Sequence, residues 1–196
     1  MISQRLYSQD YEVLTWPEVG QHCFSLAKKI IESGEEFDRI VALARGGVSI
    51  AQSIGDLLGI KPISVIRSEL YTGINSTAKT PIITESLSAS IKNERILLID
   101  DLADSGESLL FATQYLHAHG PAVIKTATLA SKPWTKLEPD YYVFTSKAWI
   151  IFPWETREHI ETLSQMWLQK GMQQSAVVEG LKKLGYSADE ITTFYP

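Results

Sequence analysis

The 196-residue sequence contains a single cysteine, Cys23. One cysteine excludes an intramolecular disulfide and is typical of a protein that folds in a reducing compartment. No apolar run approaches the roughly 18 residues of a membrane-spanning helix. The first residues, Met1 to Tyr7, show no hydrophobic signal segment. The sequence therefore predicts a cytoplasmic protein with no membrane partner.

Basic charge is also scarce. The chain has 18 Lys and Arg against 23 Asp and Glu, a formal net charge of −5. A nucleic-acid-binding protein usually carries a basic stripe, so we expect no nucleic-acid partner. The four histidines are scattered, and no zinc-ligand spacing or Ser-His-Asp set is visible. Internal repeats and low-complexity segments are absent as well.

Helical and strand patterns alternate along most of the chain, and this alternation predicts an α/β fold with a mainly parallel sheet flanked by helices. The segment Thr15-Trp-Pro-Glu18 is typical of a capping box at a helix start, and Gly34 would end that helix. Strands are expected at 38–44, 62–66, 95–100, 123–129, 141–145 and 149–154, and further helices at about 49–58 and 105–119.

Two regions depart from this alternation. Residues 67–94 are polar and rich in turn formers and predict a long mobile loop, with 69–80 as a lid. From Glu155 the pattern is helical, with a helix at about 175–184 and a final turn capped by Ser187. We expect a main domain at 1–155 and a C-terminal helical extension at 156–196, packed on the core or on a partner subunit.

The most informative stretch runs from Ile96 to Phe111. An apolar strand ends in two carboxylates, Asp100 and Asp101, and a polar loop leads into a helix. A helix N-terminus presents free N–H groups to a phosphate. Carboxylates suit sugar hydroxyls and, directly or through water, Mg²⁺. The combination favours a sugar phosphate carrying a metal ion.

Simpler interpretations of the same residues stay open. The two aspartates could be a solvated pair that caps a turn, and Asp104 or Ser105 could be an ordinary helix N-cap. An N-cap explains one polar residue, however, and not four polar residues around Gly106.

This stretch resembles the phosphoribosyl-pyrophosphate (PRPP) signature of the type I phosphoribosyltransferases. The resemblance implies their fold, with a small hood beside the main sheet. It implies that Asp100 and Asp101 bind the ribose hydroxyls and approach Mg²⁺. It also implies that the following loop cradles the 5′-phosphate. That loop consists of Ala103, Asp104, Ser105, Gly106, Glu107 and Ser108.

A second segment, Ala44-Arg45-Gly46-Gly47, stands where the family has its pyrophosphate loop. Glycine N–H groups and a guanidinium suit a diphosphate leaving group. The family often has a non-prolyl cis peptide here, so we expect one between Ala44 and Arg45. By the same resemblance, Tyr71, Thr72 and Lys79 of the lid would close over the pyrophosphate, and Arg67 could reach it.

By the same resemblance, the base pocket involves Asp104 and three further residues, Lys132, Trp149 and Ile150. Asp104 is typical of 6-oxopurine enzymes, where a carboxylate handles the N7 proton. Lys132 would bind the exocyclic O6; the alternative is an exposed loop lysine. Trp149 would stack on the base, and Ile150 would offer backbone groups to its far edge. For Trp149 the alternative is simple core packing.

Taken together, the resemblance implies a purine-salvage enzyme. It would transfer phosphoribosyl from PRPP to N9 of guanine, xanthine or hypoxanthine and release pyrophosphate, with Mg²⁺ as cofactor and Asp104 and Arg45 as catalytic residues. A homodimer or homotetramer is expected. One alternative is a PRPP-binding regulatory protein without catalysis, which the acidic charge balance disfavours. Another is a PRPP synthetase, which usually duplicates the domain.

Overall fold

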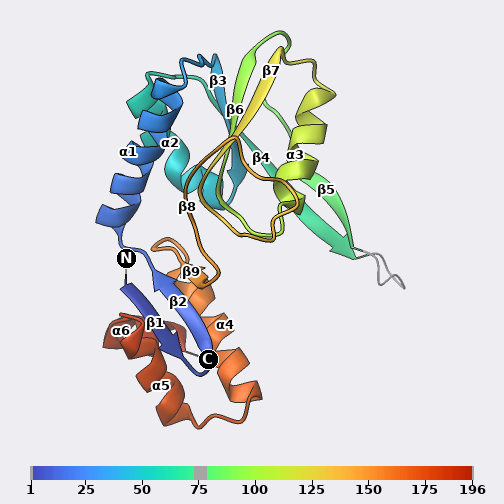
Figure 1. Cartoon of the computed structure of the whole chain (residues 1–196). Helices are drawn as coiled ribbons and strands as arrows, with labels where there is room; N and C mark the ends of the chain where they lie inside the picture. Colours follow the sequence, from blue (N-terminus) through green and yellow to red (C-terminus); the bar gives the residue numbers. More distant parts are fainter. Residues whose placement is uncertain (1, 73–78, 196) are drawn as a thin grey trace. The chain divides into compact units, whose positions relative to one another are not determined.

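The computed structural model of the protein describes residues 2–72 and 79–195 (Figure 1). The chain forms two compact units. The central unit comprises residues 20–146, and the terminal unit combines residues 1–19 with 147–196. Segment 147–155 thus groups with the C-terminal helices and with the N-terminus. No helix in the described ranges has both the length and the apolar composition needed to cross a bilayer.

The central unit is built on a six-stranded sheet of order β5-β4-β3-β6-β7-β8 (Figure 1). Every neighbouring pair is parallel except β4 with β5, which confirms the predicted mainly parallel α/β fold. The strands are β3 (Arg39–Ala44), β4 (Ile63–Thr72), β5 (Lys79–Glu85), β6 (Arg95–Ala103), β7 (Val123–Ser131) and β8 (Tyr141–Thr145).

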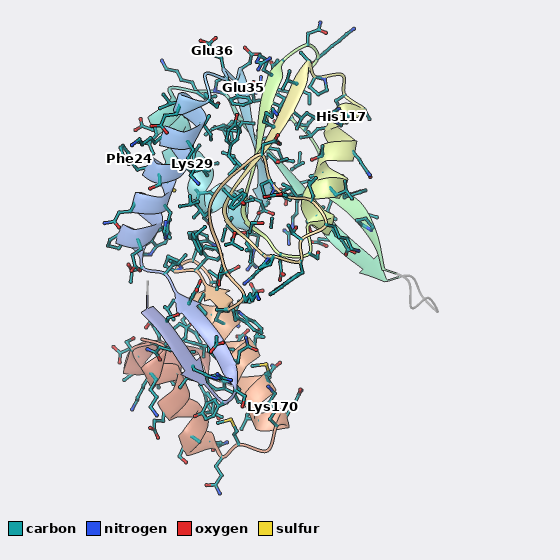
Figure 2. All side chains as sticks on the ribbon, in the orientation of Figure 1. Phe24, Lys29, Glu35, Glu36, His117 and Lys170 are labelled. Atoms are coloured by element: carbon teal, nitrogen blue, oxygen red, sulfur yellow. The ribbon has the colours of Figure 1, made fainter. Side chains whose placement is uncertain are left out.

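Three helices accompany this sheet: α1 (Trp16–Glu32), α2 (Gly46–Leu58) and α3 (Glu107–His117). The capping box predicted for α1 is present, because Thr15 and Glu18 bind each other's backbone N–H groups at 2.8 and 3.5 Å. Helix α1 buries its apolar stripe, whereas Phe24 and Lys29 lie on its exposed side (Figure 2).

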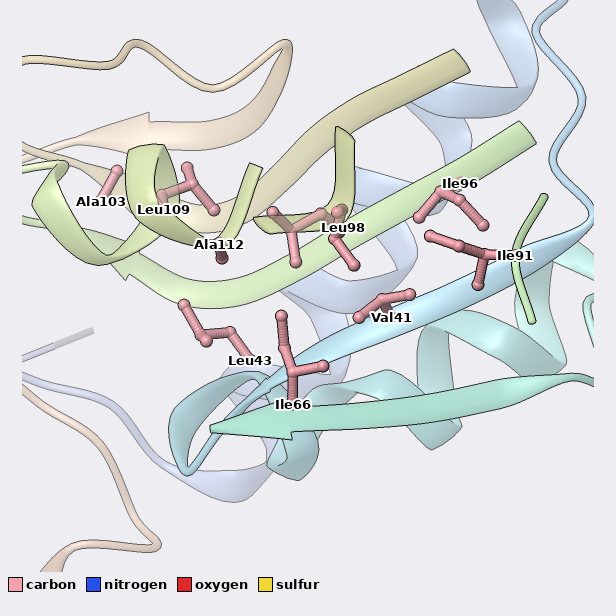
Figure 3. Packing of buried hydrophobic residues seen from close by; sticks show 10 residues of the cluster. Val41, Leu43, Ile66, Ile91, Ile96, Leu98, Ala103, Leu109 and Ala112 are labelled. Atoms are coloured by element: carbon pink, nitrogen blue, oxygen red, sulfur yellow. The ribbon is translucent and has the colours of Figure 1, made fainter. Parts of the chain in front are cut away.

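Helices cover both faces of the sheet. Val41 and Leu43 of β3 and Leu98 of β6 pack in one cluster with Leu109 of α3 (Figure 3). The alternate residue Ile40 points to the other face, where α2 packs. Strands buried on both faces need apolar residues at successive positions, which explains the unbroken apolar runs in the sequence.

The prediction of a long loop at 67–94 is wrong for residues 67–72 and 79–85, which form strands. Strand β4 continues to Thr72, and β5 returns antiparallel to it, with Tyr71 opposite Thr80. This ribbon forms one edge of the sheet. It is held by main-chain hydrogen bonds, and its sequence does not show the apolar alternation that would have predicted two strands. Pro81 is tolerated because it lies on an edge strand. Residues 73–78 of the predicted lid lie outside the described residues.

The terminal unit combines both ends of the chain. Its sheet has the order β1-β2-β9, with β2 antiparallel to β1 and parallel to β9. Tyr11 and Trp167 are fully buried in its core. The sequence did not predict the N-terminal hairpin. The elements are β1 (Ile2–Leu6), β2 (Gln9–Val13), β9 (Trp149–Ile151), α4 (Thr156–Gln169), α5 (Gln174–Lys183) and α6 (Ala188–Phe194).

Candidate active site

Two loops of the central unit leave the same edge of the sheet, because β3 and β6 are parallel neighbours. They are the 44–47 loop after β3 and the 103–108 loop after β6. A Cβ atom added to Gly46 would overlap the Asp101 carboxylate, and one added to Gly47 would overlap the Ile99 carbonyl oxygen. At Gly47 the obstacle is backbone and only glycine fits, whereas a side chain at position 46 would require the Asp101 carboxylate to move. The sequence interpretation assigned both glycines to phosphate binding, and the structure adds that they let β6 approach the loop.

The helices that follow these loops begin without a side-chain cap. Arg45 is the N-cap of α2 and Gly106, with φ of +78°, is the N-cap of α3. Asp104 does not cap α3, while Ser105 Oγ accepts the N–H of Glu107 at 3.3 Å. The Glu107 N–H is thus occupied by Ser105, and the Gly47 N–H donates to the Asp100 carboxylate, so the other N–H groups of the first turns are the ones suited to an anion. The peptide bond between Ala44 and Arg45 is cis, as expected.

Asp100 and Asp101 lie at the end of β6, as predicted. Both are partly buried, and the Asp101 N–H donates to Asp100 Oδ1 at 3.0 Å. Burial and the neighbouring Asp101 carboxylate raise the pKa of Asp100 well above its usual range. A cation or a donating hydroxyl at this pair would favour the charged form of both side chains.

The loop after β7, residues 132–137, brings two further groups to this edge. Lys132 is only 4% exposed, so the alternative of an exposed loop lysine is wrong. The Trp134 Nε1–H donates to Asp104 Oδ1 at 2.9 Å, and Lys132 Nζ lies 5.6 Å from the centre of the Trp134 ring. Sequence reasoning missed Trp134, because nothing in the pattern around Lys132 marks the indole as a partner of Asp104.

The 132–137 loop also holds the 103–108 loop. The Lys136 N–H donates to the Ser105 carbonyl at 2.9 Å, and Lys136 Nζ pairs with Glu107 Oε1 at 2.6 Å. A Cβ added to Gly106 would lie 2.7 Å from the Leu137 nitrogen. The conformation of the 103–108 loop thus depends on contacts with a segment about 30 residues further along the chain.

The predicted base-stacking residues belong to the terminal unit. Trp149 is partly buried on β9, and Ile150 is 4% exposed. The Trp149 Nε1–H donates to His159 Nε2 at 3.4 Å. Burial lowers the pKa of His159 to about 4, so the ring is neutral at pH 7 and can accept this hydrogen bond. The sequence interpretation missed His159.

Comparison with known proteins identifies the family. The family model described as the phosphoribosyl transferase domain matches residues 10–160. The chain belongs to the phosphoribosyltransferase family.

Two relatives show how closely the chain resembles known family members. It is 30% identical over 148 residues to xanthine-guanine phosphoribosyltransferase of Gluconobacter oxydans, covering 74% of this chain and 85% of the relative. It is 37% identical to a purine phosphoribosyltransferase from Pyrococcus horikoshii, whose crystal structure matches with a TM-score of 0.67 over 74% of this chain and 93% of that one. The xanthine-guanine-hypoxanthine phosphoribosyltransferase of Helicobacter pylori shares the type I phosphoribosyltransferase fold at 20% identity, with a TM-score of 0.64 and coverage of 74% and 94%.

The donor set of this phosphoribosyltransferase fits a metal ion that arrives with its substrate. Mg²⁺ keeps several water molecules and usually takes only one or two protein carboxylates beside substrate oxygens. Asp100 and Asp101 supply that number. In the described parts of the chain, no group of three or more His, Cys, Asp or Glu side chains could hold a metal by itself.

The residues predicted to form a lid are described only in part. Tyr71 and Thr72 end β4, and Lys79 begins β5 opposite Thr72. Arg67 lies beside Ala44 in the register of β4 and β3. Its guanidinium pairs with Glu69 at 2.9 Å and with Glu85 at 3.6 Å.

Proposed function

We propose that this phosphoribosyltransferase is a purine-salvage enzyme. It transfers phosphoribosyl from Mg²⁺-bound PRPP to N9 of a 6-oxopurine and releases pyrophosphate. The observation that carries the proposal is the pairing of Asp104 and Lys132 on one indole ring, beside the glycine-rich loops at the same sheet edge. The Gluconobacter relative is a xanthine-guanine phosphoribosyltransferase and the Pyrococcus relative a purine phosphoribosyltransferase, which supports a purine substrate.

The uncapped starts of α2 and α3 suit the pyrophosphate and the 5′-phosphate of PRPP. In this proposal the 103–108 loop and α3 hold the 5′-phosphate, and the 44–47 loop with Arg45 holds the pyrophosphate. Asp100 and Asp101 hold the ribose hydroxyls and the metal-bound side of the substrate. Mg²⁺, when bound there, would neutralise charge on the departing pyrophosphate.

The base is read by chemically matched groups. A purine that attacks through N9 must lose or shift a proton, and the exposed Asp104 carboxylate can accept it at N7. The Lys132 ammonium suits O6, where negative charge develops. That Trp149 stacks on the purine ring, with Ile150 at its far edge, stays a prediction of the family resemblance. No covalent nucleophile is required, since positioning and charge stabilisation lower the barrier.

The direct test is an assay of pyrophosphate release with Mg²⁺, PRPP and each free base in turn. We expect turnover with at least one of guanine, xanthine and hypoxanthine, and none with orotate or uracil. PRPP binding without turnover on any base would instead support the regulatory alternative.

The role of Asp104 has a separate test. The Asp104→Asn variant should lower kcat by about 100-fold or more, with KM for PRPP changed less than about twofold. Asp56→Asn, at an exposed position on α2, is the matched control and should keep wild-type kinetics. Equal losses of kcat and of PRPP binding in Asp104→Asn would contradict proton handling.

A further inference from the structure

We propose that Trp134 is a positioning residue for the purine: its one ring fixes both the Asp104 carboxylate and the Lys132 ammonium. The inference rests on the proposed function and deepens it, because it explains how the two base-reading groups keep their relative placement. Neither the family match nor the sequence pattern assigns Trp134 a role.

The exposure of Trp134 calls for an explanation other than core packing. Its side chain is 54% exposed, although tryptophan usually occupies interiors or interfaces. The 132–137 loop does not need the indole to keep its shape. The Thr135 N–H donates to the Lys132 carbonyl at 3.1 Å, and the Lys136 N–H donates to the Ser105 carbonyl at 2.9 Å. What the indole adds is its contact with two charged side chains.

The contact with Asp104 uses the edge of the ring. An indole N–H can only donate a hydrogen bond, and a carboxylate oxygen of Asp104 accepts it. The bond of 2.9 Å occupies Oδ1 of Asp104, an exposed residue, and Oδ2 is the oxygen proposed to take the substrate proton. A carboxylate held at one oxygen loses less motional freedom when the purine arrives, which favours the transition state.

The contact with Lys132 uses the face of the ring. Its Nζ lies 5.6 Å from the ring centre, within the range of a cation–π interaction. The Lys132 backbone is also fixed, because its N–H donates to the Ala103 carbonyl at 2.9 Å. A buried lysine with a fixed backbone and an aromatic face beside its ammonium has few alternative rotamers. The same indole therefore sets the distance between the groups proposed for N7 and O6.

Two substitutions of Trp134 separate the contribution of the indole N–H from that of the ring face. Trp134→Phe keeps an aromatic face and removes the N–H donor, so kcat should fall about 10-fold, as expected for a lost bond to a charged group, with KM for PRPP unchanged. Trp134→Leu removes both contacts and should in addition raise KM for the purine several-fold. Trp16→Phe, at a 58% exposed tryptophan of the terminal unit, is the matched control and should leave both constants unchanged.

A double-mutant cycle tests whether Trp134 acts through Asp104. Once Asp104→Asn has removed the carboxylate, adding Trp134→Phe should lower kcat less than twofold further, because coupled residues are not additive. Full multiplication of the two losses would overturn the proposal. Kinetics of Trp134→Phe that match those of Trp16→Phe would also overturn it.

A third readout needs no turnover. In protein with ¹⁵N-labelled tryptophan, the indole N–H signal that disappears in Trp134→Phe belongs to Trp134. That signal should move in Asp104→Asn and stay in place in Asp56→Asn. An unmoved signal in Asp104→Asn refutes the Trp134 contact. Absence of wild-type turnover with every purine refutes the proposed function while this signal still reports on the contact, so the two failures are distinguishable.

Discussion

Helices begin in two different ways in this protein. Outside the candidate site, α1 and α6 start with capping boxes, in which Thr15 pairs with Glu18 and Ser187 with Glu190. At the sheet edge of the central unit, α2 and α3 start with no side-chain cap, and so do α4 and α5 of the terminal unit. A cap typically contributes about 1 kcal/mol to stability. A missing cap therefore does not by itself mark a ligand site; what sets α2 and α3 apart is the glycine-rich loop that precedes each of them at the sheet edge, whereas α1 and α6 satisfy their first N–H groups with capping boxes.

Glycines differ in the same way between the two settings. Gly47 and Gly106 meet backbone atoms of neighbouring segments at the edge. Gly20 in α1 and Gly185 at the end of α5 have nothing within 4 Å of an added Cβ. Glycine at the edge is therefore required by close approach, and matched substitutions in the two settings can break or sharpen the comparison.

The largest effect is expected from Gly47→Ala. The new methyl group would overlap the Ile99 carbonyl, a backbone atom of a central strand that cannot move aside. We expect a loss of about 3 kcal/mol or more in unfolding free energy. Turnover should also be lost, because the 44–47 loop is displaced. Denaturant unfolding and the pyrophosphate assay measure the two effects.

Gly20→Ala is the control for this substitution. It places alanine in the interior of α1 with open space around it and should raise stability by about 0.5–1 kcal/mol. If Gly47→Ala were as stable as the wild-type protein, the 44–47 loop would not be tightly packed against β6.

The terminal unit should respond to acid through His159. Its pKa of about 4 in the folded protein lies below the unfolded value of 6.5, because burial disfavours the charged ring. The unfolded state then binds more protons between these values, so stability falls as pH falls from 6.5 to 4. At about 1.4 kcal/mol per pKa unit, the loss reaches about 3 kcal/mol. Glu155, with Oε2 3.6 Å from Nε2, and Glu158 are the charged groups near the ring.

Unfolding of His159→Gln across this pH range measures the effect. The variant should lose the corresponding part of the pH dependence, while His117→Gln, at an exposed position of α3 (Figure 2), should retain it. An unchanged slope in His159→Gln would contradict a neutral, buried ring.

Two left-handed glycines give the third comparison. Gly106 has φ of +78° and Gly185 has φ of +97°, so alanine is strained at both, by about 1 kcal/mol. At Gly106 the methyl group would also meet Thr135 Oγ1 at 2.5 Å and the Leu137 nitrogen at 2.7 Å. Gly106→Ala should therefore lose about 1–2 kcal/mol more than Gly185→Ala and raise KM for PRPP. Equal losses of unfolding free energy in the two variants would mean that the 132–137 loop moves away from the new methyl group with no loss of stability.

The central unit could be predicted from the sequence because its signals are local. A strand buried on both faces must be apolar at every position, as in 96–99, and its polar end must lie at the sheet edge. Glycine and carboxylate positions in the two edge loops are likewise sequence-local, and the cis peptide after Ala44 was anticipated from the family resemblance.

The helices of the terminal unit were predicted, but its sheet and the 132–137 loop were not, because their partners are distant in sequence. Strand β2 pairs with β9, about 140 residues away, and nothing in either short segment reveals the other. Trp134 meets Asp104 across 30 residues, and His159 acquires its low pKa only from burial. The edge hairpin of β4 and β5 is mostly polar, so its sequence resembles that of a loop.

The smallest expected effect on stability comes from a pair of serine substitutions that distinguishes a helix cap from a ligand-binding residue. Ser187→Ala removes the side chain that accepts the Glu190 N–H at 3.2 Å, and should lower stability by about 1 kcal/mol without changing turnover. Ser105→Ala removes a hydroxyl at an edge helix whose N-cap is Gly106. It should change stability by less than about 0.5 kcal/mol and raise KM for PRPP several-fold. If Ser105→Ala instead destabilises the protein as much as Ser187→Ala does and leaves KM unchanged, Ser105 is a cap, and α3 begins like α6.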